Sequence, residues 1–278
     1  MSGFDTVAVA GLGLIGGSVA RDLAAAGVRV LGWDRDAASV DAARGEGIVS
    51  AALGADFEGL EEADVLLLAV PVGAAAAVLE TALPHLARAR LVMDTGSTKA
   101  SIVAAAERLG LGERFVGAHP FAGDHRAGWE ASRNLLFAGA TIFLCPSRLS
   151  SPASVALARA LWSRIGGVPV ALAAEEHDRR VAWTSHLPQV VSTALAQALA
   201  SHGFVRADLG PGGRDVTRLA ASPPDVWTDI LRDNRARVAE ALAAIEGRIR
   251  SIRTAIEEDD AQGIRTAFRS GQGWSTRE

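Results

Sequence analysis

His119 combines the residue type and the position that proton transfer requires. It directly follows the apolar run Phe115–Ala118 and precedes Pro120, so we expect it at the end of a strand. A neutral imidazole accepts a proton near pH 7, and ligands of α/β sheets bind beyond the carboxyl ends of the strands. Although a lone histidine often has only a structural role, this position predicts a general base that acts on a substrate hydroxyl.

Ser97 could belong to the same site or begin a helix. It lies just beyond the apolar run 91–94, in the sequence Asp94-Thr95-Gly96-Ser97-Thr98-Lys99. Its hydroxyl could hydrogen-bond the His119 imidazole and fix the tautomer of the ring, and it could also cap the helix that we expect after Lys99. Lys99 is the only lysine among 28 basic residues, which hints that this turn needs a compact ammonium group.

Two arginines in the second half of the chain are suited to binding a carboxylate. Arg214 and Arg218 follow the glycine-rich stretch 210–213, which we expect to form a turn, and Asp215 lies beside the first of them. A guanidinium group that is held in place can donate two parallel hydrogen bonds to a carboxylate, whereas exposed arginines are usually only solvated. The stretch therefore predicts a clamp for an acidic substrate.

Glycines near the N-terminus predict a dinucleotide site. Gly11, Gly13 and Gly16 follow an apolar run and form the spacing G-x-G-x-x-G. The first glycine permits the turn, the second lets a pyrophosphate approach the backbone, and the third lets the helix lie close to the strand. The helix would start at Leu14 and Ile15, where free amide groups favour an anion. We expect His119 to take up a proton while hydride leaves the substrate for the bound dinucleotide.

An acidic residue at the end of the second apolar run favours NAD. Asp34 follows this run 18 residues after Gly16, close to where such sites hold the ribose hydroxyls of the adenosine. Its carboxylate would repel a 2′-phosphate, but Arg35 could pair with one, so NADP stays open. The alternative is that Asp34 only starts a turn. Val70 and Pro71 end a further apolar run at the same edge and are also expected to line the cofactor site.

Strands and helices alternate through the first part of the chain. Apolar runs at 7–10, 28–33, 64–70, 91–94, 115–118, 141–144 and 168–172 predict strands, with helical patterns between them. This order predicts an α/β fold, a Rossmann-type doubly wound, mostly parallel sheet. The strand signal ends near Glu175, and we expect an all-α C-terminal dimerisation domain after it. The predicted domains are 1–172, which binds the dinucleotide, and 173–278, which is helical.

The helical half contains one long amphipathic helix. Its apolar side chains recur three or four residues apart, namely Val238, Leu242, Ile245, Ile249, Ile252 and Ile256. Such a stripe packs either within its own domain or against a second copy, and we favour a homodimer formed by these C-terminal helices. In the stretch Ser185–Gln189, Pro188 is expected to kink a helix close to the site.

The composition limits the kinds of partner. A formal charge of −4 and an isoelectric point near 5.9 give no basic surface for nucleic acid or an anionic membrane. The chain shows neither a long apolar span nor a signal segment, so a cytoplasmic protein is expected. Cys145 is the only cysteine and is expected to be a small core residue. The histidines have no metal-ligand spacing, which predicts no metal site.

Taken together, the motifs resemble the prephenate/arogenate (cyclohexadienyl) dehydrogenase family of tyrosine biosynthesis. The likeness extends over nearly the whole chain, and its later motifs are the more specific ones. They are Gly11–Ser18, Asp94–Lys99, Gly117–Gly123, His177-Asp178, Ser185–Pro188 and Arg214–Ser222, with Trp227 and Asn234 beyond. The resemblance implies a nucleotide-binding domain, a helical dimerisation domain and an active site between them.

The resemblance also implies roles for single residues. His119 would deprotonate the ring hydroxyl, Ser97 would orient it, and Arg218 would hold a substrate carboxylate. His186 would belong to the substrate site. Two departures concern the substrate side chain: Gln189 stands where many relatives have a histidine, and Asp124-His125 stand where a Thr-Glu pair is frequent. We expect Gln189 and His125 to contact the substrate, and since glutamine pairs with a keto or an amino group, prephenate and arogenate both stay open.

Two other functions compete with this prediction. A β-hydroxyacid-type dehydrogenase also joins a glycine motif to a helical domain, but its lysine would lie in the second domain, whereas the only lysine here is Lys99. A dinucleotide sensor without catalysis would explain Gly11, Asp34 and the long helix, but not His119 together with Arg218. The dehydrogenase of the aromatic pathway accounts for all of them.

Overall fold

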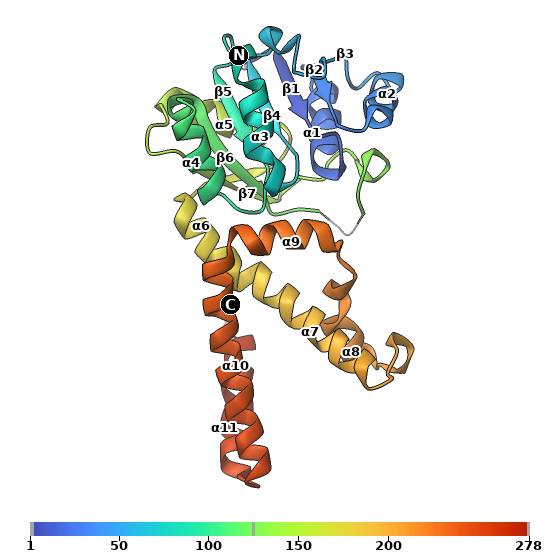
Figure 1. Cartoon of the computed structure of the whole chain (residues 1–278), viewed down its shortest axis with the longest axis vertical. Coiled ribbons are helices and arrows are strands. Elements are labelled where there is room, and N and C mark those ends of the chain that lie inside the picture. Colours follow the sequence, from blue (N-terminus) through green and yellow to red (C-terminus); the bar gives the residue numbers. More distant parts are fainter. Residues whose placement is uncertain (1–2, 124–125, 277–278) are drawn as a thin grey trace.

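The computed structural model describes residues 3–123 and 126–276. An α/β unit occupies one end of the molecule, and helices of the second half form an extension from it (Figure 1). No helix in these two ranges has the length and apolar character needed to cross a membrane.

Within the described ranges, eight strands form one sheet in the order β3-β2-β1-β4-β5-β6-β7-β8. All neighbouring strands are parallel except β6 and β7. The strands are β1 (Thr6–Ala10), β2 (Arg29–Trp33), β3 (Ala51–Ala52), β4 (Val65–Leu68), β5 (Leu91–Asp94), β6 (Phe115–Pro120), β7 (Thr141–Pro146) and β8 (Val168–Ala171). This is the predicted doubly wound sheet.

Helices cover both faces of the sheet. Successive side chains of a strand point to opposite faces, so Val7 and Val9 join one core whereas Ala8 and Ala10 join the other. Apolar residues of α1 (Leu14–Ala25), α2 (Ala37–Gly45) and α5 (Pro152–Arg164) complete the first core. Those of α3 (Val72–Ala82) and α4 (Ala100–Arg108) complete the second core. Burial on both faces explains why the central strands are apolar throughout.

The second half is helical, as predicted. It consists of α6 (Ala174–Val181), α7 (Leu187–Ser201), α8 (Pro211–Val216), α9 (Pro224–Asp233), α10 (Arg235–Glu257) and α11 (Ala261–Ser275). A π-helical turn, Ala182–His186, joins α6 to α7 immediately before Pro188. This irregular turn stands where the proline was expected to disturb the helix, because proline cannot donate the regular backbone hydrogen bond.

The long amphipathic helix is α10, and it pairs with α11 in an arm that extends away from the sheet (Figure 1). Val238, near the start of the stripe, is buried, whereas Ile249 and Ile256 farther along are 58% and 60% exposed. Phe268 and Trp274 of α11 are also largely exposed. The outer part of the stripe is therefore not covered within one chain.

The stretch 210–213 is not the turn that its glycines predicted. Gly210 precedes α8, and Pro211 occupies the first turn of this helix, which also contains Gly213 and Arg214. Proline is favourable at the first turn because its fixed φ suits a helix and its missing N–H has no partner there. At Gly213 an added Cβ would lie 3.2 Å from the Leu209 Cβ, so a larger residue would be crowded there.

Candidate active site

His119 lies near the end of β6, as its sequence position predicted. In the ladder it faces Phe143 of β7, and the rings of Phe121, Phe143 and His177 surround its imidazole at centroid distances of 5.0–6.4 Å. His119 Nδ1 lies 2.8 Å from Nε2 of His177, which belongs to α6. His119 is half-buried, so its ring is held by neighbours and still reaches the surface.

A buried carboxylate continues this chain of hydrogen bonds. His177 Nδ1 lies 2.8 Å from Asp178 Oδ1, and both residues are almost fully buried. Asp178 also accepts hydrogen bonds from the Lys99 amide at 2.8 Å and the Ala100 amide at 2.9 Å. Burial alone would raise the pKa of the Asp178 carboxyl, but the bonds from His177, Ala100 and Lys99 together lower it. Asp178 is therefore ionised at neutral pH.

The surroundings of His119 keep its ring neutral. Burial lowers its pKa well below the usual value, and the charges on His177, Lys99 and His186 would act in the same direction. A neutral imidazole has one nitrogen with a lone pair and can accept a proton. The ring therefore has the protonation state that a base needs.

Lys99 is completely buried and forms an ion pair with Asp94 at the end of β5. Asp94 also accepts a hydrogen bond from the Gly96 amide at 2.9 Å. The Lys99 side chain lies against β6, where a Cβ at Gly117 would be 3.1 Å from the Lys99 Cδ. The methylene chain of Lys99 thus packs against the strand that carries His119, while its ammonium group pairs with Asp94.

Ser97 follows β5 and is partly buried, at the same edge of the sheet. Among the described residues no hydrogen bond joins Ser97 to His119; the partner at the Nδ1 atom is His177. The alternative role of Ser97 as a helix cap is wrong. The helix α4 begins after Lys99, and its first amides are capped by Asp178 of the second half of the chain.

The dinucleotide turn has the geometry that its glycines predicted. Gly11 has φ +94°, and a Cβ at Gly16 would lie 1.8 Å from the Gly11 oxygen, so neither position accepts a side chain. At Gly13, in contrast, the nearest atom to an added Cβ is 4.0 Å away, which leaves the backbone open to a ligand. Gly13 precedes α1, and no side chain caps the helix, so the amides of Leu14 and Ile15 face this space.

Asp34 lies at the end of β2, beside this turn. Its carboxylate accepts hydrogen bonds from the Leu12 amide at 2.6 Å and the Asp36 amide at 2.8 Å. The side chain is thus fixed next to the glycines, with acceptor capacity left for hydroxyl groups. Val70 lies on the other side of the turn, where its Cγ1 would be 3.2 Å from a Cβ at Gly11. An open amide cradle beside a fixed carboxylate fits NAD, whose pyrophosphate and ribose need these two groups.

The remaining predicted cofactor residues are more exposed. Pro71 directly precedes α3 and is exposed, as is Arg35, which follows Asp34. The segment beyond His119 passes over the start of α1, because a Cβ at Gly123 would lie 3.7 Å from Ile15 Cδ1. His119 and the dinucleotide turn therefore border the same space at the carboxyl edge of the sheet.

His186 belongs to a second polar cluster within the helical half. Its Nδ1 lies 3.3 Å from Asn234 Nδ2, which also donates to the Asp178 carbonyl at 2.8 Å, and its ring packs edge-on against Trp227. Burial lowers the pKa of His186 to about 4, although the Asp178 carboxylate acts in the opposite direction. Asn234 thus connects this cluster to the backbone of Asp178, whose carboxylate bonds His177.

Gln189 is buried, and both ends of its amide bond to the protein. Its Nε2 donates to the Leu219 carbonyl at 2.7 Å, and its Oε1 accepts from the Ser222 hydroxyl at 3.3 Å. Arg218 begins the short helical turn that contains Leu219, and its side chain is exposed. His125, the remaining predicted substrate residue, lies outside the described residues.

His177, Asp178 and Asn234 are functional candidates to which no single sequence pattern assigned a role. The sequence showed them only as parts of motifs that the chain shares with its relatives. They lie 56 to 79 residues from some of the groups they contact, so no local pattern points to these contacts.

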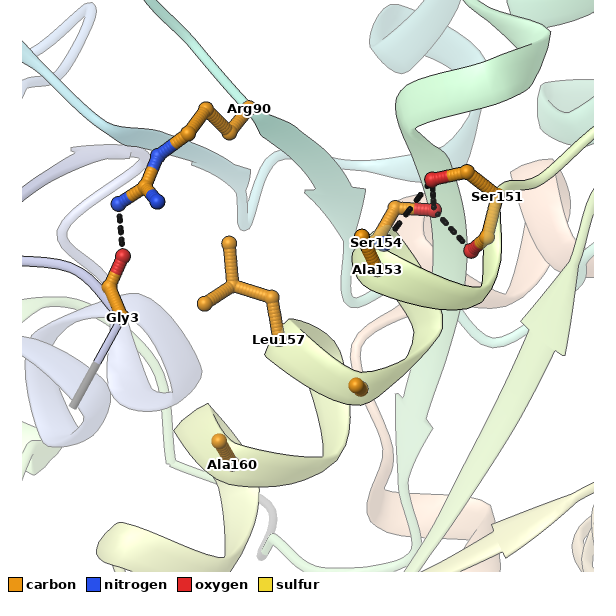
Figure 2. A pocket seen from close by; sticks show the side chains of 8 residues that line it. Gly3, Arg90, Ser151, Ala153, Ser154, Leu157 and Ala160 are labelled. Carbon is orange, nitrogen blue, oxygen red and sulfur yellow. Dashed lines mark hydrogen bonds between the residues drawn. The ribbon is translucent and has the colours of Figure 1, made fainter. Parts of the chain in front are cut away.

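One cavity lies apart from all these groups. It measures about 310 Å³ and is lined mainly by small side chains of α5, with Arg90 bonded to the Gly3 carbonyl at its edge (Figure 2). None of the predicted site residues lines it. Within the described ranges, no group of three or more acidic, histidine or cysteine side chains could hold a metal ion.

The chain matches two domain families in succession. Residues 19–171 match "Prephenate dehydrogenase, nucleotide-binding domain", and residues 173–270 match "Prephenate dehydrogenase, dimerization domain". Prephenate dehydrogenase of Bacillus subtilis is 31% identical over 97% of this chain and 75% of its own length. Cyclohexadienyl dehydrogenase of Zymomonas mobilis is 31% identical over 98% of this chain and 95% of its own length.

A solved structure agrees in fold. Prephenate dehydrogenase from A. aeolicus, in complex with hydroxyphenyl propionate and NAD+, superimposes with a TM-score of 0.87 at 29% identity. The match covers 98% of this chain and 97% of that one. The mostly parallel sheet with a helical second half is therefore the arrangement of this family.

Proposed function

The chain belongs to the prephenate dehydrogenase family, and on this premise we propose that it oxidises and decarboxylates prephenate, arogenate or both with NAD in tyrosine biosynthesis. The observation that supports this most directly is the neutral, half-buried imidazole of His119 at the same edge of the sheet as the dinucleotide turn. Both substrates carry a ring hydroxyl whose carbon is oxidised and a ring carboxylate that leaves.

The cofactor would be held by the turn at Gly11, Gly13 and Gly16, by the amides at the start of α1, and by Asp34. A nicotinamide bound there would supply the hydride acceptor for the carbon that carries the hydroxyl. The carboxylate of Asp34 favours unphosphorylated ribose, which supports NAD over NADP.

His119 takes up the hydroxyl proton as that carbon is oxidised to a ketone. The ketone is conjugated to the carbon that bears the ring carboxylate, so the electron pair of the breaking C–C bond enters the ring as CO2 leaves. The ring becomes aromatic, and its oxygen is then a phenolate that can take the proton back from His119. Ser97 is proposed to orient the hydroxyl in this sequence.

Arg218 is proposed to bind a carboxylate of the substrate, because its planar guanidinium can donate two parallel hydrogen bonds. His186, Gln189 and His125 are proposed to line the side-chain end of the substrate. The Gln189 amide bonds to Leu219 and Ser222, so it would contact a substrate with its remaining hydrogen-bonding capacity. Prephenate and arogenate differ only at this end.

We further propose that residues 1–172 and 173–278 are the two domains, and that the protein is a homodimer through its C-terminal helices. The exposed side chains of Ile249, Ile256, Phe268 and Trp274 provide an apolar surface on the arm formed by α10 and α11. A second copy would bury this surface, which the sequence stripe had also indicated.

The test is NADH formation with prephenate, arogenate and a 3-hydroxyacid, measured side by side. Turnover of either cyclohexadienol supports the proposal, and turnover of the hydroxyacid alone overturns it. His119→Asn is expected to lose most of the turnover, on the order of 100-fold or more, with NAD affinity nearly unchanged. His202→Asn is a matched control, because His202 is exposed and bonds only within its own helix region. An equal loss of turnover and NAD affinity in His119→Asn would indicate a structural histidine.

A further inference from the structure

We propose that His177 and Asp178 are positioning residues that fix the tautomer of His119, so that its Nε2 carries the lone pair that receives the substrate proton. This inference rests on the proposed role of His119 as the base. It adds a function for two buried residues on α6, which lie outside the dinucleotide turn.

The argument begins at the carboxylate. Asp178 Oδ1 accepts from the Lys99 amide and Oδ2 accepts from the Ala100 amide, at the N-terminus of α4. Both amides and the dipole of α4 favour negative charge on Asp178. An ionised carboxylate can only accept, so the atom of His177 that faces it at 2.8 Å, Nδ1, must carry a hydrogen.

The tautomer of the second ring follows from that of the first. In the form of His177 that carries a single ring hydrogen, on Nδ1, the lone pair lies on Nε2. This Nε2 lies 2.8 Å from His119 Nδ1, which must therefore be the donor. A neutral His119 with hydrogen on Nδ1 leaves Nε2 as its only acceptor. The direction of both bonds is thus set by the carboxylate at the buried end.

The chain of hydrogen bonds is rigid as well as directional. His177 is 0% exposed and Asp178 is 2% exposed, so water cannot replace either partner. Asn234 holds the backbone of Asp178 by donating to its carbonyl at 2.8 Å. Both His177 and Asp178 lie on α6, whereas their partners lie on β6 and at the start of α4. The packing of the helical half against the sheet therefore brings His119 into the tautomer that can accept a proton at Nε2.

Other charged or titratable side chains lie on the strands and helices that surround these two hydrogen bonds. Asp94 and Lys99 form their ion pair at β5 and the start of α4, Cys145 lies on β7, and His186 follows α6. Arg180 of α6 lies over the Phe143 ring, with its Cζ 5.8 Å from the ring centroid. Within the described part of the chain, Asp178 is the carboxylate that hydrogen-bonds His177.

Three substitutions of His177 separate its two bonds. His177→Gln can place an amide oxygen near the former Nε2 and still accept from His119. His177→Asn can place an amide nitrogen near the former Nδ1 and still donate to Asp178, but it does not reach His119. His177→Phe removes both bonds while keeping a ring in the core. We expect kcat to fall on the order of 10- to 100-fold in the Asn and Phe variants and clearly less in the Gln variant.

KM and NAD affinity are expected to change less than about threefold in all three variants, since His177 is not proposed to touch either ligand. The tautomer itself is read from the ¹⁵N shifts of the His119 ring, which is practicable because the chain has only 6 histidines. The native protein is expected to show hydrogen on Nδ1 and none on Nε2, and His177→Phe a mixture of both tautomers.

The two readouts distinguish the possible failures. If the native His119 shows hydrogen on Nε2, or if His177→Phe leaves the tautomer and kcat unchanged, the positioning role is wrong. If the tautomer shifts as expected but neither cyclohexadienol is turned over by the native protein, the proposed function is wrong instead. A variant that unfolds is identified by its loss of NAD binding. If the Asn and Phe variants unfold, His177→Gln is the remaining test. A complete loss of kcat in His177→Gln at normal NAD affinity would then overturn the inference.

Discussion

Replacing Lys99 by methionine tests how much the buried ion pair with Asp94 stabilises the folded protein. Methionine has a similar length but no charge, so the change leaves the Asp94 carboxylate without its partner in a position that is 2% exposed. Burial already raises the pKa of Asp94, against the influence of Lys99. Removing the ammonium group is expected to raise it further.

The expected cost is about 3–5 kcal/mol of unfolding free energy at pH 8, the usual penalty for breaking a buried pair by removing one partner. The cost depends on pH with a definite sign. A carboxyl group whose pKa is higher in the folded than in the unfolded state binds more protons when folded, so its contribution falls as pH rises. The penalty of Lys99→Met is therefore expected to be smaller at pH 5 than at pH 8.

The assay is urea unfolding followed by circular dichroism at both pH values. The double variant Lys99→Met with Asp94→Asn, which buries no charge, is expected to be more stable at pH 8 than Lys99→Met alone. Arg29→Met is the matched surface control, because Arg29 pairs with Glu62 at 2.5 Å but both side chains are about half exposed, and it is expected to cost less than about 1 kcal/mol. The reasoning would be refuted if Lys99→Met cost no more unfolding free energy than Arg29→Met. It would also be refuted if the double variant were no more stable than Lys99→Met alone.

Three further predictions concern substrate binding, acid stability and the cofactor turn. Arg218→Ala is expected to raise KM roughly 10- to 150-fold, equivalent to about 1.5–3 kcal/mol for a lost charged hydrogen bond, and an unchanged KM in steady-state kinetics would exclude Arg218 from the site. The pKa of His186 is about 4 in the folded protein, compared with an ordinary value of 6.5. The unfolded state therefore binds a proton on this histidine at a higher pH than the folded state does. The free energy of unfolding thus decreases as the pH drops from 6.5 toward 4. This contribution amounts to about 3 kcal/mol, and urea unfolding of His186→Gln should show a correspondingly weaker acid dependence. Gly16→Ala would put a Cβ 1.8 Å from the Gly11 oxygen and is expected to weaken NAD binding in a calorimetric titration, whereas Gly45→Ala, with no atom within 4 Å, should leave it unchanged.

Local sequence patterns determined the α/β half almost completely. The run before Gly11 becomes β1, the run before Asp34 becomes β2, and His119 ends up at the carboxyl end of β6. These outcomes are encoded locally, because a strand buried on both faces needs an apolar run and a tight turn needs glycine. The family resemblance was likewise readable from short motifs.

The surroundings of the base were decided only by the tertiary structure. His119 meets His177, 58 residues away, and the amide of Lys99 meets Asp178, 79 residues away. The sequence offered Ser97 as partner of the imidazole and as cap of α4, and the structure has His177 at Nδ1 and Asp178 at the helix start. Such contacts depend on how α6 docks against β7 and α4, and no periodicity along the chain specifies that docking.

The glycine-rich stretch before Arg214 is a second place where the sequence pattern and the tertiary structure differ. Glycine and proline predicted a turn, but proline also suits the first turn of a helix, and α8 forms there. Local patterns in the sequence thus determined most strands of the sheet and the residues at their ends, but they did not predict α8. Folding decided which side chains meet, because burial and hydrogen bonding join residues by their distance in space and not by their separation along the chain.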